Sequence, residues 1–143
     1  MAMSNYLEEQ LINHLFRTNT FPKPTTLGIA LLTVAAVDTD TGALAGKEVA
    51  NSFGYARQTL NPLDGNWKNP ANPTQGETDN VTAVTFGPAN GGNWGTVVGV
   101  AICDSSVHGG GNLLFYGLLS TSKVVNDGDT FKFNIGDLNI QLD

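Results

Sequence analysis

Short apolar runs separated by turns rich in glycine and asparagine occupy the second half of the chain. Three such turns lie at residues 90–93, 109–112 and 126–129. Because glycine and asparagine tolerate the positive φ angles of tight turns, this pattern is typical of short strands joined by hairpins. The pattern predicts five strands, at residues 81–86, 96–103, 113–119, 130–135 and 138–142.

Two further strands are expected nearer the N-terminus. Residues 26–34 are apolar on both faces, which indicates a strand buried in the middle of a sheet. Phe53, Tyr55 and Arg57 alternate with smaller residues, which indicates a half-buried strand over residues 53–59.

The last two predicted strands alternate cleanly between apolar and polar residues. A register break at Gly136 separates them, and a glycine there suits a bulge or a strand that crosses between sheets. The side chains expected to point inward are Phe131, Phe133, Ile135, Leu138, Ile140 and Leu142.

The one clear helix is predicted over residues 5–17. Asn5 and Glu8 have the spacing of a capping box, and Glu8 lies in the first turn, where the helix dipole favours negative charge. An apolar stripe runs along one side of the helix. We expect this stripe to pack on the protein's own sheet, and a neighbouring subunit is the alternative. The apolar stripe comprises Leu7, Leu11, Ile12, Leu15 and Phe16.

These elements predict a mainly β fold, a jelly-roll-like β-sandwich with one N-terminal amphipathic α-helix. One domain is expected over residues 1–143, with the helix at 5–17 and the sandwich at 25–143. Only 14% of the residues are charged, against about 25% in ordinary soluble domains. A neutral polar surface suits a protein whose faces lie against other proteins, although a β-protein with few lysines fits this composition equally well.

Several classes of partner are disfavoured by charge and composition. The net charge is −6 and the seven basic residues form no cluster, so we expect no binding of nucleic acid or of an acidic membrane. No apolar run reaches the 18 residues that a membrane-spanning helix needs. Cys103 is the single cysteine, and its apolar surroundings indicate an inert core thiol.

Nothing in the sequence has the spacing of a common catalytic site. Asp104, Ser105 and His108 contain the residue types of a catalytic triad, but side chains this close on one loop rarely reach triad geometry. We interpret them as a solvated turn, and His14 as a residue on the helix surface. The chain is therefore expected not to be an enzyme, to hold no cofactor and to have no catalytic residue.

Asp38 and Asp40 resemble the start of a calcium-binding loop. Gly42 occupies the fifth position, where an EF-hand needs a ligand, so the match fails and we expect no metal site. A hard cation held between the two carboxylates remains the alternative.

A long loop at residues 61–79 is the most unusual segment. It contains Pro62, Pro70 and Pro73, and its main apolar side chains are Leu63 and Trp67. Loops of this length are often functional. Trp67 is interpreted either as an anchor for a partner or as the loop's own tether to the core. The candidate partner contacts are Trp67 and Leu63, followed by Asp38 and Asp40.

Five segments together resemble a family of small tailed-bacteriophage virion structural proteins. They are Ser-Asn-Tyr-Leu at 4–7, Gly-Tyr-Ala-Arg at 54–57, Trp-Gly-Thr at 94–96, Gly-Asn-Leu-Leu at 111–114, and the segment at 127–133. Members of that family are often labelled phage tail fibre proteins, and others are similar to capsid cement or decoration proteins. The resemblance spans nearly the whole chain except the loops at 35–50 and 61–79.

The resemblance implies a homo-oligomer, with a trimer as the first expectation, assembled in the host cytoplasm. Because the chain has no coiled-coil heptads and no repeated shaft, we favour a cement protein on the capsid exterior that clamps adjacent major capsid protein subunits. A tail fibre or tail-associated adsorption domain is the alternative. A third hypothesis is a carbohydrate-binding sandwich that uses Trp67 and Trp94, although Trp94 is expected in the core.

Overall fold

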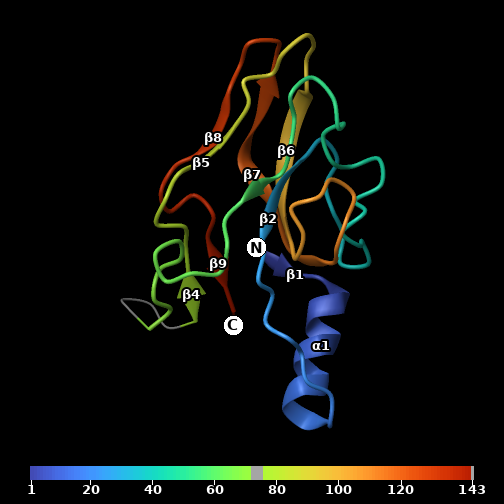
Figure 1. Ribbon diagram of the computed structural model, residues 1–143, viewed down its shortest axis with the longest axis vertical. Helices are drawn as coiled ribbons and strands as arrows, with labels where there is room; N and C mark the ends of the chain where they lie inside the picture. The colour runs from blue at the N-terminus through green and yellow to red at the C-terminus, as the bar shows by residue number, and fades with distance from the viewer. Residues whose placement is uncertain (72–75, 143) are drawn as a thin grey trace.

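The computed structural model describes residues 1–71 and 76–142, and within them the chain forms one helix and nine strands (Figure 1). The helix is α1 (Asn5–Phe16). No helix in these two ranges has the length and apolar character to cross a lipid bilayer. The strands are β1 (Ala2–Met3), β2 (Gly28–Leu32), β3 (Gln58–Thr59), β4 (Glu77–Thr78), β5 (Val84–Phe86), β6 (Gly95–Cys103), β7 (Leu113–Val125), β8 (Phe131–Phe133) and β9 (Ile140–Gln141).

The strands form one antiparallel sheet of five, in the order β1-β7-β6-β2-β3, and two smaller pairs, β4-β9 and β5-β8. The strand pairs in the second half of the chain are nested one within the next: β6 pairs with β7, β5 with β8 outside them, and β4 with β9 outside those. Such nesting arises when one long hairpin rolls over onto itself, which is how a jelly roll is built. The predicted mainly β sandwich with a single helix is confirmed.

Strand β2 lies at the centre of the fold, and all five of its residues are buried. Its side chains alternate between two apolar clusters, one on each face of the large sheet. Ile29 and Leu31 enter the larger cluster, which lies between the large sheet and the two strand pairs. Ala30 and Leu32 enter the smaller cluster on the opposite face. The prediction of a strand buried on both faces is therefore confirmed.

Aromatic side chains fill one end of the larger cluster. The rings of Tyr55 and Trp94 meet edge to face, with 5.4 Å between their centroids, and those of Phe131 and Phe133 do so at 5.0 Å. Such geometry adds to the free energy gained from burial alone. The Trp94 indole N–H donates to the carbonyl of Phe53 over 2.9 Å. Trp94 is thus a core residue, as predicted.

The helix begins at Asn5 as predicted, but its N-cap is one residue earlier than in the predicted capping box. Ser4 is the N-cap, and its side-chain oxygen accepts a hydrogen bond from the Leu7 amide at 3.3 Å. The same hydroxyl donates to the carbonyl of Leu113 on β7, and the Ser4 side chain is fully buried. The prediction of Asn5 as the cap was wrong because Ser4 anchors the helix to the sheet as well as capping it.

The apolar stripe does not pack on the protein's own sheet. Only Leu7, in the first turn, is buried, whereas Ile12, Leu15 and Phe16 are 58%, 69% and 81% exposed. Figure 1 shows the reason, since α1 leaves the body of the domain and extends beyond the end of the sheet. The expectation that the stripe covers its own sheet was therefore wrong.

The predicted strand at 53–59 is mostly a turn. Only β3 at its end pairs with the sheet, and both Phe53 and Gly54 have positive φ angles, of 52° and 77°. The alternating pattern arises because the side chains of Tyr55 and Arg57 both point into the fold. Tyr55 packs in the aromatic cluster, and Arg57 binds the buried carboxylate of Glu48. The alternating pattern therefore reflects the burial of the Tyr55 and Arg57 side chains, although their segment does not form a strand.

Strand β7 is longer than predicted, and the end of the chain is more exposed. A bulge places residues 119–122 of β7 opposite a single residue of β6, so the polar Ser-Thr-Ser run does not end the strand. Near the C-terminus, Leu138 is buried but Ile135 and Leu142 are 66% and 49% exposed. The turn at Gly136 moves the chain from one strand pair to the other, as a crossing between sheets requires.

Candidate interaction site

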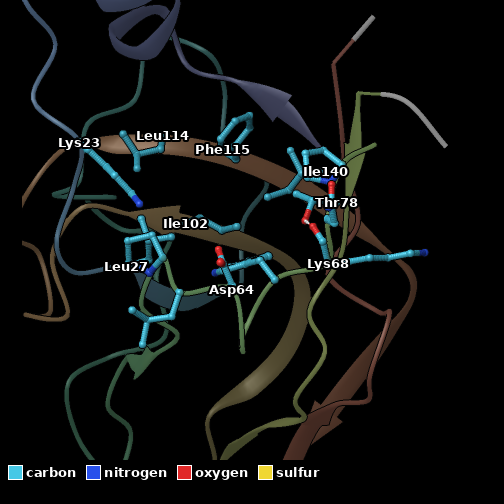
Figure 2. Close-up of a pocket in the computed structure, with 14 residues that line it drawn as sticks. Lys23, Leu27, Asp64, Lys68, Thr78, Ile102, Leu114, Phe115 and Ile140 are labelled. Atoms are coloured by element: carbon cyan, nitrogen blue, oxygen red, sulfur yellow. Dashed lines mark hydrogen bonds between the residues drawn. The ribbon is translucent and has the colours of Figure 1, made fainter. Parts of the chain in front are cut away.

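An open apolar groove of about 600 Å³ lies between the long loop and the large sheet (Figure 2). Its floor consists of the buried side chains of Ile102, Leu114 and Ile140. Pockets that bind partners commonly have such an apolar lining with few polar groups. The remaining residues around the groove are Lys23, Leu27, Pro62, Leu63, Asp64, Trp67, Lys68, Asn69, Pro70, Thr78 and Phe115.

Trp67 lines this groove and also fastens the long loop. Its indole N–H donates to the carbonyl of Leu60 over 3.3 Å, and its ring is partly buried against the larger core cluster. Leu63 lies in the same turn, where its carbonyl accepts from the Trp67 amide, and its side chain is 61% exposed. Trp67 is therefore the loop's tether to the core and also lines the groove, while Leu63 is the more exposed of the pair.

The described part of the long loop has ordered structure. Its two arms pair antiparallel, since the Lys68 amide donates to the Asp79 carbonyl at 2.9 Å and Trp67 forms an isolated bridge with Asn80. The Lys68 ammonium lies 3.2 Å from the Asp79 carboxylate. Pro73 lies outside the described residues. The paired arms fix the wall of the groove that carries Trp67.

Asp38 and Asp40 lie on the other face of the large sheet. Burial raises the pKa of Tyr116, and the nearby carboxylates of Asp38, Glu8 and Asp40 raise it further. Tyr116 packs on the smaller cluster, whereas Phe115 lines the groove. Neighbouring residues of a strand face opposite sides of the sheet. The structure thus brings Trp67 and Leu63 together but separates them from Asp38 and Asp40.

The Asp40 carboxylate is already occupied by groups of its own loop. It accepts from the Val37 amide at 2.8 Å and lies 2.6 Å from the Lys47 ammonium. Burial alone would raise the pKa of Asp40, but the hydrogen bonds and charge of Lys47 and the Val37 amide outweigh it and lower the pKa. Within residues 1–71 and 76–142, no three His, Cys, Asp or Glu side chains gather where a metal ion could bind.

A buried ionic cluster lies beneath the loops at the end of the sheet. Arg57 binds the Glu48 carboxylate and also donates to the carbonyls of Gly42, Ser105 and Gly110, at 2.7, 3.1 and 2.9 Å. A guanidinium has five N–H donors in a fixed plane, which suits it to join several groups at once. This cluster ties the β2–β3 segment and the β6–β7 loop to one side chain, so we assign it to the stability of the fold.

Asp104, Ser105 and His108 have separate partners. The Asp104 carboxylate accepts from the Asn112 amide at 2.6 Å, and the Ser105 oxygen accepts from the Val107 amide at 3.2 Å. His108 Nε2 lies 2.9 Å from the Val49 carbonyl. No hydrogen bond in the described part of the chain joins Ser105 to His108, so the structure does not assemble these residues as a triad.

Sequence reasoning missed most of the groove. Leu27, Leu114, Phe115 and Ile140 line it, but their apolar character alone predicts only burial. The signal that could have pointed to them is the long loop itself, because a proline-rich arm with one large aromatic residue has to lie against some part of the sheet.

A model of the family described as Gp80, podophage GP4 fiber I protein gp80, matches residues 2–141. The match includes α1, the groove and the buried ionic cluster. No curated protein matches the chain.

Proposed function

Because the chain belongs to the family of the podophage GP4 fiber I protein gp80, we propose that it is a fibre subunit of a podophage particle. Membership makes the chain a bacteriophage virion structural protein. The match over residues 2–141 is the observation that carries the proposal. Its description names a fiber protein, so it supports the tail-fibre alternative more than the capsid cement role that we favoured from the sequence.

The groove fits a protein that works by docking. Its floor is apolar, it is open to solvent, and the exposed Leu63 stands at its side. Apolar hollows of this kind bind apolar side chains of a partner, which gain free energy as water leaves both surfaces. We propose that the subunit acts as a homo-oligomer, with three copies as the first expectation, and that its groove contributes to a contact within the virion.

Labelling intact particles with an antibody against this protein tests the proposal. A fibre subunit is expected to place the label on fibres at the tail. Label spread over the head surface would contradict the fibre role and support a cement protein bound to the major capsid protein.

Deleting the gene gives a second, independent readout. Loss of a fibre subunit is expected to lower adsorption to the host while the heads keep their DNA on heating. Loss of a cement protein is expected to do the reverse, because a cement stabilises the shell by binding its assembled form. Heads that release DNA earlier, with adsorption unchanged, would therefore overturn the proposal.

A further inference from the structure

The large sheet has one long edge that is only partly covered. Strand β7 pairs with β6 along one side, whereas on its other side only Tyr116 and Phe115 have partners, in the two-residue strand β1. Within residues 1–71 and 76–142, no strand lies beside this side of residues 117–125, which we call the open edge. A row of unpaired main-chain N–H and C=O groups of this kind is a template on which the strand of another chain can pair.

The composition of the open edge favours such pairing. Leu118 and Val124 are 71% and 54% exposed, and the stretch between them consists mainly of serine and threonine. The open edge contains no proline, and Lys123 is the single charged residue of β7. Segments with high strand propensity, little charge and no proline pair readily with copies of themselves. Copies of the chain would therefore associate at the open edge unless the structure opposes it.

The side chain of Lys123 points to the inner face of the large sheet. Lys123 lies opposite Val97, which is fully buried in the larger cluster, and residues directly opposite each other in paired strands face the same side. The Lys123 ammonium lies over the Phe131 ring, 5.4 Å from its centroid. Because Phe131 belongs to β8, the lysine side chain reaches from the large sheet to the opposing strand pair.

The space that Lys123 crosses is an open slot of about 580 Å³ between β7 and β8. Strand β8 pairs with β5 alone in the described part of the chain, so its side toward the slot is also without a partner strand. Its one charged residue, Lys132, lines the slot as well. Each free strand edge beside the slot therefore carries one charge, and both charges are positive.

The two lysines have no acidic partner among residues 1–71 and 76–142. The lining of the slot contains one acidic residue, Asp137, whose carboxylate accepts a hydrogen bond from the Asn134 amide at 2.6 Å. Neither Lys123 nor Lys132 forms an ion pair with Asp137 or with any other described carboxylate. Both ammonium groups therefore depend on water for their solvation, and Lys123 has the Phe131 ring as a further contact.

A strand that paired with the open edge would cover the mouth of the slot and remove water from Lys123. Burying an ammonium group that has no acidic partner costs more free energy than a few main-chain hydrogen bonds return. A lysine on the outer face of the sheet could turn its ammonium group into solvent. An inward lysine cannot do so, because a shift in register would move its neighbours to the wrong face.

The bulge in β7 adds a second obstacle. Residues 119–122 lie opposite the single residue Val98, so the main chain of the open edge is bent in its middle. A straight strand could therefore follow the open edge on only one side of the bend at a time. Lys123 lies directly after the bend, where it opposes pairing with the second half of the open edge.

We infer that the inward charge of Lys123 keeps the open edge of β7 from pairing with other copies of the chain. This inference goes beyond the proposed function and holds for a subunit of the fibre or of the head. The homo-oligomer proposed above is then assembled through other surfaces. Sheet edges that pair without closing build fibrils, so blocking this edge keeps the assembly limited to a closed oligomer.

Substitutions of Lys123 test the inference. Lys123→Val removes the charge and supplies a residue that favours strands. At equal concentration, its mass measured by light scattering should rise about tenfold or more above that of the wild type, because edges that pair without closing add further copies. Lys123→Arg keeps the charge and should match the wild type. Lys23→Val is the control, because Lys23 is exposed, lies outside β7 and has no ion pair among the described residues.

Amide hydrogen exchange locates the contact. In the wild type, the amides of residues 119–122 have no partner in β6 and should exchange rapidly, also within its oligomer. In the associated Lys123→Val protein, exchange across residues 117–125 should slow by about tenfold or more. Lys123→Thr is a second neutral variant that suits a strand, and the same changes are expected of it. It keeps the test valid if valine alters the stability of the fold.

Protection of residues 119–122 in the wild-type oligomer would overturn the inference, because the open edge would then be a contact between copies. Neutral variants of Lys123 with the mass of the wild type would overturn it as well. Association of these variants while residues 117–125 still exchange rapidly would place the contact elsewhere. Equal association of Lys23→Val would show that the loss of any lysine is sufficient, which also contradicts the inference.

Discussion

Arg57 holds Glu48 through two parallel hydrogen bonds inside the fold, with Nε 2.8 Å from Oε1 and Nη2 2.7 Å from Oε2. The side chains are 0% and 1% exposed. Burial would lower the pKa of Arg57, but the hydrogen bonds and charge of Glu48 outweigh it and raise the pKa. Tyr55 adds a third bond by donating its hydroxyl to Glu48 Oε1 at 2.9 Å.

Removing one partner of this pair is expected to be strongly destabilising. Arg57→Met leaves the Glu48 charge buried and unpaired, so the free energy of unfolding should fall by about 3–5 kcal/mol, measured by urea denaturation. Lys47→Ala is the control, because its pair with Asp40 is partly exposed and should contribute less than about 1 kcal/mol.

Replacing Glu48 and Arg57 together tests whether the hydrogen bonds from Arg57 to the three loop carbonyls contribute to stability. Changing Glu48 and Arg57 together to Met removes both charges, which by itself is often nearly neutral. The carbonyls of Gly42, Ser105 and Gly110 would still lose their donor. The double variant should therefore remain clearly less stable than the wild type, and recovery to wild-type stability would show that the three carbonyls contribute nothing.

The Cys103 thiol should be unreactive until the domain unfolds. Burial raises the pKa of Cys103 to about 11, and the side chain is fully buried. The thiolate is the reactive form, so almost none is present at pH 8. A thiol reagent is expected to modify the native protein only at the rate of unfolding, and to modify it at once in denaturant. Rapid modification without denaturant would contradict this prediction.

Asp40 should stabilise the fold only above acidic pH. Its pKa is lowered in the folded chain, so its contribution is present above the unfolded value of about 3.9 and is lost as the pH falls through the lower folded value. Asp40→Asn should therefore be less stable than the wild type at pH 7, by up to about 1 kcal/mol, because the ion pair is partly exposed. The difference should begin to shrink as the pH falls below about 4 and should vanish once the pH is below the lowered pKa of Asp40. In a Lys47→Gln background the difference should shrink at all pH values.

Substitutions of Trp67 and Leu63 should distinguish a role in holding the long loop on the core from a role in binding a partner. Trp67→Ala removes the bond to Leu60 and contacts with the core, so the free energy of unfolding should fall by about 2 kcal/mol or more. Leu63→Ser changes an exposed side chain, and its effect should stay within about 0.5 kcal/mol. Occupancy on purified particles should nevertheless fall about tenfold for Leu63→Ser, and unchanged occupancy would remove Leu63 from the contact.

Strands with strong local signals were predictable from the sequence. The buried run at β2 and the long β6 both follow from apolar residues bounded by turns, and both occur close to the expected bounds. The segment around Tyr55 was not predictable in this way, because the same alternation results from a turn whose side chains reach distant partners. Local periodicity reports which residues are buried, and only the tertiary structure decides what buries them.

The candidate site was predictable only in part. Leu63 and Trp67 could be chosen because large apolar side chains in a polar loop need an explanation. The floor of the groove could not be predicted, since Ile102 and Ile140 belong to different sheets and meet through packing that no local pattern specifies. The exposed stripe of α1 illustrates the same limit, because amphipathic spacing does not tell which surface the helix meets.

Three of the acceptors of Arg57 are main-chain carbonyls, and every amino acid supplies that oxygen. Loop side chains can therefore change without removing the bonds that hold the loops, except where space forbids it, as at Gly42, whose added Cβ would collide with the Gly111 carbonyl. Exposed positions such as Val107 are under no such restriction. The outer surface of these loops is therefore free to vary in sequence while the backbone beneath it keeps the same bonds.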